Sequence, residues 1–189
     1  MVVAARIAVP VIWGLWLLYW AIAAANVKTV RWRPPTGQRL LQTLPFVIAP
    51  VLIFVHDPDW GVLAQPFIPF HPFEPVLGAL ILAAGFAFAV WARVHLGRDW
   101  SGTVRLKEDH SLVTSGPYRF VRHPIYTGIL LGFIGSALAF GEWRGILAIL
   151  VILFGILVRC RAEEQAMRET FPEYEEYRRK TRALIPFVY

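Results

Sequence analysis

Five stretches of the chain contain no charged residue and are rich in aliphatic and aromatic side chains. They cover residues 7–25, 40–55, 76–92, 125–140 and 145–158. A helix needs roughly 20 apolar residues to cross the ~30 Å hydrocarbon core of a membrane, and somewhat fewer where basic side chains extend from its ends. The pattern therefore predicts five transmembrane helices. The second is expected to be kinked, because it contains Pro45 and Pro50.

The last two apolar stretches are separated only by Gly141, Glu142, Trp143 and Arg144. So short a connection joins antiparallel neighbours, so these stretches are expected to form a helical hairpin that returns the chain to its starting side. Residues 1–92 then hold three membrane helices. Residues 93–189 hold a polar loop, the hairpin and a C-terminal helical cap that Pro172 opens, all within a single membrane domain.

The composition favours a membrane protein and excludes a disordered one. Of the 189 residues, 57% are hydrophobic and 17% are charged, and the mean hydropathy is +0.51. Soluble domains carry about 25% charged residues. The single cysteine, Cys160, excludes an intrachain disulfide and a site built from several cysteines, and no metal site is expected.

A formal net charge of +6 would favour nucleic acid binding in a soluble protein, so the placement of the basic residues decides its meaning. With five spans, all of the 19 Lys and Arg residues except Arg6 and Arg144 fall on one side of the membrane. The opposite side receives the proline-rich loop 56–75, whose charged residues are all acidic. Basic residues collect on the cytoplasmic side. The distribution predicts an outside N-terminus, a cytoplasmic C-terminus and no nucleic acid partner.

The first apolar stretch has an alternative interpretation as a cleaved signal peptide, because Ala23 and Ala25 resemble the small residues of a cleavage site. Cleavage would leave Lys28, Arg31 and Arg33 outside, against the charge distribution. The apolar run is also longer than a signal core of about 7–15 residues. A membrane helix is therefore the better interpretation.

A polar segment precedes the predicted hairpin. Gly116 and Pro117 form a turn signal, and Pro124 can open the fourth helix, because a helix leaves its first N–H groups free. His123 and Tyr126 then lie at the mouth of the membrane, beside helix N–H groups that attract anions. The segment indicates a site for a polar ligand at this depth.

A second polar segment follows the hairpin. Arg159 and Glu163 share a helix face where the fifth helix leaves the bilayer, and Glu164 comes next. Because the hairpin returns the chain, both polar segments meet at one level. Simpler interpretations stay open: Arg159 with Glu163 as an ion pair worth about 0.3–0.5 kcal/mol, and Arg119 and Arg122 as interfacial anchors.

The order and spacing of several short motifs resemble the isoprenylcysteine carboxyl methyltransferase family. The resemblance covers residues 110–187, and the first 90 residues contribute only a compatible topology. The motifs are Leu112-Val-Thr-Ser-Gly-Pro-Tyr118, Arg122-His-Pro-Ile-Tyr-Thr-Gly128, Glu163-Glu164, Phe171-Pro-Glu-Tyr-Glu-Glu-Tyr-Arg-Arg-Lys180 and Leu184-Ile-Pro-Phe187.

This resemblance implies an all-α integral membrane enzyme with five transmembrane helices, the last two a helical hairpin, and a C-terminal cytoplasmic helical segment. It implies S-adenosylmethionine as the cofactor, held at the cytoplasmic ends of the last helices. Arg159 matches the family's substrate-side arginine and would orient the acceptor, and Arg105 is a further candidate near the cofactor. The implied cofactor pocket comprises His110, Ser111, Leu112, Val113, Tyr118, His123, Pro124, Tyr126 and Glu163.

The resemblance further implies methyl transfer to a lipophilic acceptor reached from the membrane lipid, most simply the carboxylate of an isoprenylcysteine-type thioether. A carboxylate needs no general base, whereas an amine does, and Glu163, Glu164 or His123 would supply it. Related phospholipid N-methyltransferases carry a similar Arg-His-Pro and Glu-Glu core. An amine acceptor therefore stays open, as do an NADPH-dependent reductase of the sterol reductase type, a non-catalytic membrane scaffold and the oligomeric state.

Overall fold

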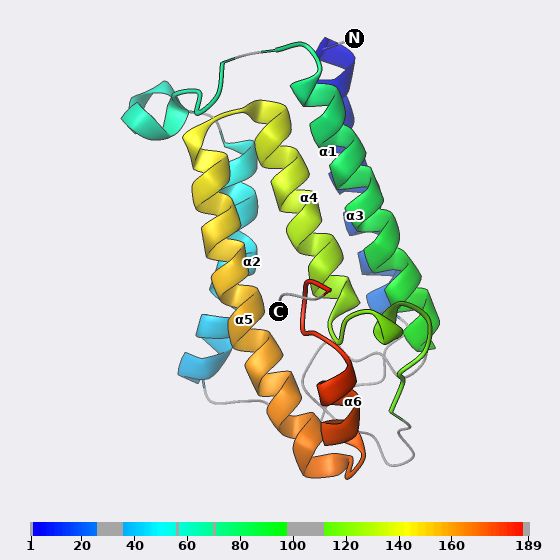
Figure 1. Ribbon diagram of the computed structural model, residues 1–189. Helices are drawn as coiled ribbons and strands as arrows, with labels where there is room; N and C mark the ends of the chain where they lie inside the picture. Colours follow the sequence, from blue (N-terminus) through cyan, green and yellow to red (C-terminus); the bar gives the residue numbers. More distant parts are fainter. Residues whose placement is uncertain (1, 26–35, 56, 70, 98–111, 187–189) are drawn as a thin grey trace.

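The computed structural model describes residues 2–25, 36–55, 57–69, 71–97 and 112–186, and over these ranges the backbone is mostly helical (Figure 1). The all-α prediction is therefore confirmed for the described residues. The elements in chain order are α1 (Val2–Ala25), α2 (Thr36–Phe54), η1 (Pro58–Ala64), α3 (Glu74–Leu96), η3 (Gly116–Arg119), α4 (Pro124–Phe140), α5 (Trp143–Thr170) and α6 (Tyr174–Lys180).

Four of the described helices, α1, α2, α3 and α5, are long and apolar enough to cross a membrane. The helix α4 is apolar as well, but with 17 residues it is shorter than a usual crossing of about 20. The prediction of a helical membrane protein is confirmed. The described residues contain four helices that could span a membrane and the shorter α4, so the predicted count of five transmembrane helices is not confirmed.

The helix α5 extends well beyond the apolar stretch that predicts it. That stretch ends at residue 158, whereas the helix continues to Thr170. The added residues are largely Arg, Ala, Glu, Gln and Met, which are good helix formers, so the backbone stays helical where the hydropathy falls. This extension carries Arg159, Glu163 and Glu164 on a continuous helix.

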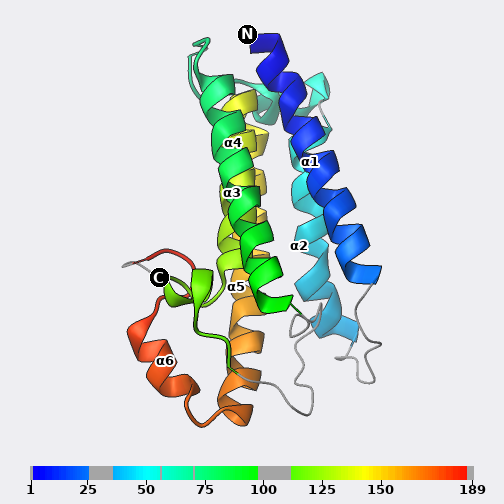
Figure 2. The same cartoon turned by 90° about the vertical axis from the view of Figure 1, so that its right-hand side faces the viewer.

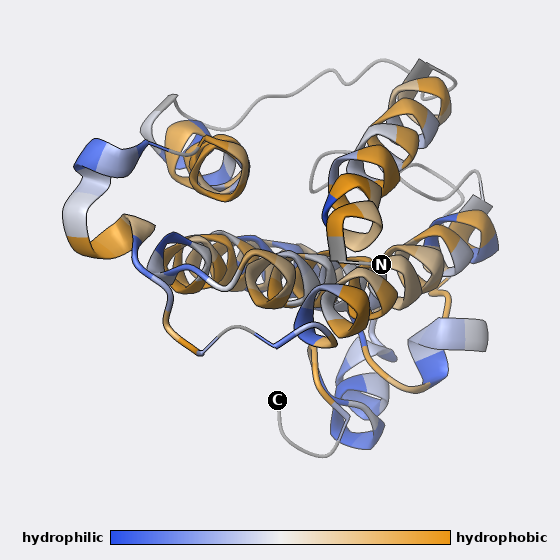
Figure 3. Cartoon of the chain, turned by 90° about the horizontal axis from the view of Figure 1, so that it is seen from above, coloured by the Kyte–Doolittle hydropathy of each residue, from blue (hydrophilic) through white to orange (hydrophobic). Residues whose placement is uncertain are grey.

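The helices α3, α4 and α5 lie side by side, and α1 and α2 lie on one face of this layer (Figures 2 and 3). Within the layer α4 packs between α3 and α5, while α1 packs mainly on α3 and α2 on α5. The hydrophilic helix α6 lies on the opposite face, near the C-terminus (Figure 3). The layer therefore separates the two N-terminal helices from the C-terminal cap.

Glycines allow α3 and α4 to approach each other closely. A side chain added at Gly85 would meet the backbone oxygen of Gly128, and one added at Gly78 would meet the backbone oxygen of Gly135. Membrane helices associate through such close contacts, because lipid tails remove the hydrophobic driving force between helices. The α3–α4 pair forms a firm frame for the first turn of α4.

The indole of Trp13 fixes α1 on this frame. It packs edge to face against Phe86 and Phe133, with ring centroids 4.8 and 5.1 Å away. Its buried N–H donates to the hydroxyl of Ser136 at 2.9 Å. A buried tryptophan needs such a partner for its single polar atom, so the contact specifies the register of α1 against α4.

The antiparallel hairpin of α4 and α5 is present as predicted, joined by Gly141 in the left-handed conformation (φ 73°) and Glu142 (Figure 1). Beside this turn, Arg144 is buried and pairs with Glu142. The guanidinium also donates to backbone carbonyls at the C-terminal end of α2, among them Leu52 at 3.0 Å and Val55 at 3.2 Å. Arg144, one of the two basic residues on the acidic side, thus caps the C-terminal end of α2, where the last carbonyls of a helix lack partners.

Candidate functional site

The C-terminal segment holds the chain just before α4. The backbone N–H of Arg122 donates to the carbonyl of Arg182 at 2.8 Å, and that of His123 donates to Ala183 at 3.0 Å. Pro124 is buried and begins α4 as predicted. Proline lacks an N–H donor and suits the first position of a helix. Arg122 and His123 are therefore fixed by their backbone hydrogen bonds to the C-terminal segment and by the start of α4 directly after them.

Two hydroxyl groups extend this attachment. The Thr127 hydroxyl, one turn into α4, donates to the carbonyl of Leu184 at 2.7 Å, and the buried Tyr177 hydroxyl of α6 donates to the carbonyl of Tyr118 at 2.7 Å. Burial raises the pKa of Tyr177 to about 12, so this hydroxyl remains a donor at neutral pH. The C-terminal cap therefore completes the wall around the start of α4.

The imidazole of His123 lies between two carboxylates of α5. Its Nδ1 is 3.4 Å from Glu163 Oε2, and its Nε2 is 3.3 Å from Glu164 Oε1. Burial alone would lower the pKa of His123, but hydrogen bonds to Cys160, Glu163 and Glu164 raise it well above 6.5. The raised pKa of His123 favours the protonated imidazole, in which both ring nitrogens can donate to these carboxylates.

Glu163 and Arg159 meet the aromatic side chains of two other helices. The Tyr126 hydroxyl of α4 donates to Glu163 Oε1. The guanidinium carbon of Arg159 lies 5.2 Å from the ring centroid of Phe46 in α2 and 5.9 Å from that of Tyr126. Such distances allow cation–π attraction to both rings. Arg159 is thus positioned by aromatic contacts, beyond the simple ion pair with Glu163 that the spacing suggests.

Glu164 is bound by Arg122, which also closes the cap. Arg122 Nε is 2.8 Å from Glu164 Oε1, and the two side chains are only 9% and 12% exposed. The same guanidinium donates to the carbonyls of Arg178, at 3.2 Å, and Thr181. The interpretation of Arg122 as an interfacial anchor is therefore wrong, because its charge is used inside the protein. Arg119 is exposed and lies over the ring of Phe120.

The remaining predicted pocket residues lie around this centre or outside the described residues. Leu112 and Val113 are half-buried, and Leu112 packs against the aromatic cluster of the cap. Tyr118 is buried, stacks on His95 and is near enough to Glu163 for that charge to raise its pKa, after the larger effect of burial. His110, Ser111 and Arg105 lie outside the described residues.

Four residues of this centre are absent from the predicted cofactor pocket. They are Phe46, Cys160, Arg122, which is expected as an interfacial anchor, and Glu164, which is named only as a candidate base for an amine acceptor. The pair Glu163-Glu164 carried a signal for the last, because adjacent helical carboxylates point about 100° apart and need separate partners. The sequence carries no equivalent signal for Phe46, which reaches the site from an otherwise ordinary apolar helix.

The fold and site define a helical membrane protein with a buried, charged centre where α4 begins and α5 leaves its apolar stretch. The sequence model of the phospholipid methyltransferase family matches residues 73–174, which include α3, α4 and α5. The chain belongs to this family, and its resemblance to isoprenylcysteine carboxyl methyltransferases is confirmed by individual relatives.

The chain is 30% identical over 160 residues to a probable protein-S-isoprenylcysteine O-methyltransferase of Oryza sativa, covering 82% of this chain and 83% of that protein. It is 33% identical over 101 residues to a protein-S-isoprenylcysteine O-methyltransferase of Schizosaccharomyces pombe, covering 51% and 43%. It is also 32% identical over 143 residues to the cobalt-zinc-cadmium resistance protein CzcN of Cupriavidus metallidurans, covering 75% of this chain and 59% of that protein.

Proposed function

We propose that the protein is an S-adenosylmethionine-dependent methyltransferase that methylates the carboxylate of a lipophilic acceptor of the isoprenylcysteine thioether type. Membership in a methyltransferase family and the names of several relatives support the reaction class. The observation that carries the choice of acceptor is the position of the His123 imidazole between the carboxylates of Glu163 and Glu164, with Arg159 held nearby. The same relatives favour methyl transfer over the reductase alternative.

The donor set of the site fits the cofactor. S-adenosylmethionine carries a sulfonium, an ammonium, a carboxylate and an adenine, and when bound it supplies the methyl group for an in-line displacement. Glu163, whose side chain is 24% exposed, suits the cationic groups, while Tyr126 and His123 offer polar contacts beside it. Leu112 and Val113 offer half-buried apolar surface for the adenine. His110, Ser111, Tyr118 and Pro124 complete the proposed pocket.

The charges of the site favour a carboxylate acceptor over an amine. An amine must lose a proton before it attacks, so it needs a general base. The raised pKa of His123 disfavours it as a base, Glu163 accepts from Tyr126, and Glu164 is bound by Arg122. A carboxylate needs only desolvation and a cationic guide. Arg159 supplies that guide at the side of the site facing α2.

The membrane orientation is part of the proposal. The basic residues of α6 and the end of α5 lie at the end of the bundle that holds the site (Figure 1). The opposite end holds η1 and the start of α3, which carry the acidic residues Asp57, Asp59 and Glu74. The positive-inside rule then makes the site and the C-terminus cytoplasmic and the N-terminus external. The cofactor would enter from the cytoplasm, and the apolar tail of the acceptor would approach laterally from the lipid.

Calorimetry with S-adenosylhomocysteine on the detergent-purified protein tests cofactor binding. We expect saturable binding that Glu163→Gln weakens by about tenfold, as expected for the loss of a charge-assisted contact. Glu169→Gln is the matched control, because Glu169 is exposed on the same helix and should leave the affinity unchanged. The absence of saturable binding to the wild-type protein would contradict the proposal.

Transfer of a labelled methyl group into a total membrane extract tests the acceptor. A base-labile ester in the labelled product is the expected result. Label in a stable amine lipid would overturn the carboxylate assignment and select phospholipid N-methylation. Arg159→Ala should abolish the ester while retaining binding of S-adenosylhomocysteine.

A further inference from the structure

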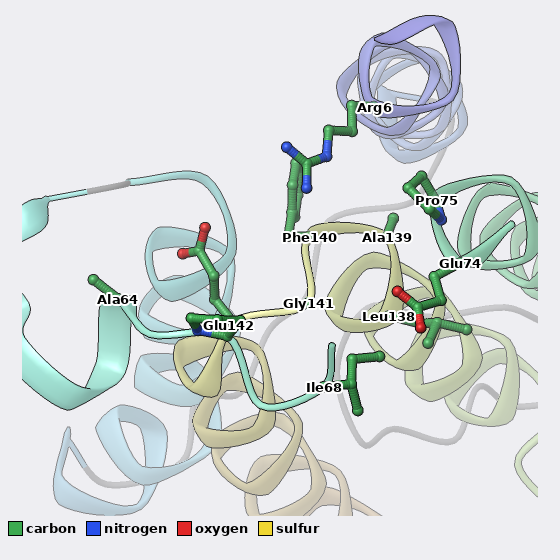
Figure 4. A pocket seen from close by; sticks show the side chains of 11 residues that line it. Arg6, Ala64, Ile68, Glu74, Pro75, Leu138, Ala139, Phe140, Gly141 and Glu142 are labelled. Carbon is green, nitrogen blue, oxygen red and sulfur yellow. The ribbon is translucent and has the colours of Figure 1, made fainter. Parts of the chain in front are cut away.

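A small cavity lies at the end of the bundle opposite to the candidate site. Its volume is about 150 Å³. Its walls come from α1, from the segment between η1 and α3, from the first turn of α3 and from the turn between α4 and α5 (Figure 4). A cavity of this size holds a group of about the size of benzene. The methyl transfer proposed above makes no use of it.

Three charged side chains line this cavity: Arg6, Glu74 and Glu142. Glu74 and Glu142 lie on the two sides of Gly141, and Arg6 reaches in from α1 (Figure 4). The three come from separate parts of the chain: Arg6 from α1, Glu74 from the start of α3 and Glu142 from the α4–α5 turn. They meet because these parts of the chain line the same cavity. Charges of both signs therefore surround one small space.

Glu142 and Glu74 differ in how the protein compensates their charge. Glu142 pairs with the buried guanidinium of Arg144. Glu74 is only 9% exposed, and its Oε2 accepts the backbone N–H of His71 at 3.0 Å. The start of α3 also favours a negative charge. Glu74 is thus held at the cavity wall by the backbone donor of His71.

The rest of the lining is apolar and continues toward the membrane. Ile68, Leu138 and Phe140 belong to the wall, and the neighbouring side chains Val3 and Ile7 on the outer surface of α1 are more than half exposed. The ends of membrane helices lie at the level of the lipid headgroups. A ligand that fits this place has a small charged head and apolar chains that remain in the bilayer.

We propose that this cavity binds the headgroup of a zwitterionic phospholipid with a primary ammonium, namely phosphatidylethanolamine. The ammonium would donate to Glu74, and the phosphate would accept from Arg6, because guanidinium and phosphate form strong charge-assisted hydrogen bonds. A choline headgroup has no N–H to donate to Glu74, and the anionic headgroup of phosphatidylglycerol has no cation. The inference is independent of the proposed methyl transfer.

Native mass spectrometry of the full chain, delipidated in detergent, tests the proposal with phosphatidylethanolamine, phosphatidylcholine and phosphatidylglycerol offered separately. We expect preferential retention of phosphatidylethanolamine. Arg6→Gln and Glu74→Gln should each weaken this retention by about tenfold, as for other lost charge-assisted contacts. Soluble glycerophosphoethanolamine should compete only weakly, because it lacks the apolar chains; full competition would show that a free headgroup and not a membrane lipid is bound.

Two controls keep the result interpretable. Arg119→Gln removes an exposed charge at the other end of the molecule and should leave lipid retention unchanged. Arg159→Ala should also leave it unchanged; if it abolishes retention, the lipid occupies the candidate transferase site and the proposal is wrong. Equal retention of the three lipids, or full retention in Arg6→Gln, would likewise overturn it. If Glu74→Gln does not fold, Arg6→Gln decides the test. Arg6 is exposed, so this substitution should leave the fold intact while it removes the proposed contact with the phosphate.

Discussion

Each end of the helical bundle contains a buried arginine that pairs with a carboxylate and donates to backbone carbonyls. At one end Arg144 pairs with Glu142 and caps α2, and at the other Arg122 pairs with Glu164 and holds the C-terminal cap. The first cluster borders the cavity that Arg6 and Glu74 also line, whereas the second continues through His123 to Glu163. A buried arginine pair by itself is thus a structural device, and the added imidazole and carboxylate distinguish the candidate site.

The largest expected effect is on the stability of the first of these ends. Arg144→Met leaves the Glu142 charge and several carbonyls without their donor, and breaking a buried pair in this way costs about 3–5 kcal/mol. Denaturant unfolding in detergent should show this loss, while the affinity of the remaining folded protein for S-adenosylhomocysteine should not change. Arg119→Met, on an exposed residue, is the control.

The same substitution at the other end sharpens the comparison. Arg122→Met should lower the unfolding free energy and also weaken S-adenosylhomocysteine binding, because Arg122 fixes Glu164 and the backbone beside His123. If Arg144→Met and Arg122→Met weaken cofactor binding equally, the assignment of the cofactor site to the end that contains Arg122 is wrong.

A further prediction concerns Arg159, which belongs to the site and contacts the rings of Phe46 and Tyr126. Arg159→Ala should lower kcat by about 10²–10³-fold, the usual effect of losing a preorganised electrostatic contact. The affinity for S-adenosylhomocysteine should change little, because the proposed partner of Arg159 is the acceptor. Steady-state kinetics and calorimetry separate the two quantities. A large loss of affinity at unchanged kcat would assign Arg159 to the cofactor instead.

The sequence predicts the helices better than it predicts their contacts. Uncharged stretches reveal membrane helices without any knowledge of packing. Helical spacing extends the fifth helix to Arg159 and Glu163, but hydropathy does not mark its end at Thr170. His123 and Glu163 could be brought together because a hairpin returns the chain to its starting side. The bond from Arg122 to the carbonyl of Thr181, 59 residues away, depends on how the cap folds back, which no local pattern encodes.

The next prediction concerns the pH dependence of stability, which His123 should cause at the end of the bundle that contains Arg122. The pKa of His123 is raised above 6.5 on folding, so its contribution to stability is fully present below pH 6.5 and is lost as the pH rises through the folded value. The unfolding free energy should fall with pH in that window by up to about 1.4 kcal/mol per unit. His123→Gln should remove this slope, and His71→Gln, on an exposed histidine, should retain it. A slope that persists in His123→Gln would show that another group causes it.

The smallest predicted effect concerns the link from the site to α2. Phe46→Leu keeps an apolar side chain against α5 but removes one of the two rings near Arg159, and a cation–π contact contributes about 1 kcal/mol. We expect kcat to fall by about fivefold with unchanged cofactor affinity, since Arg159 is held less firmly while Glu163 and His123 stay in place. Phe54→Leu is the matched control, because Phe54 lies at the opposite end of α2 and packs on Trp13. If both variants reduce kcat alike, α2 acts through its general packing, and Phe46 has no separate part in positioning Arg159.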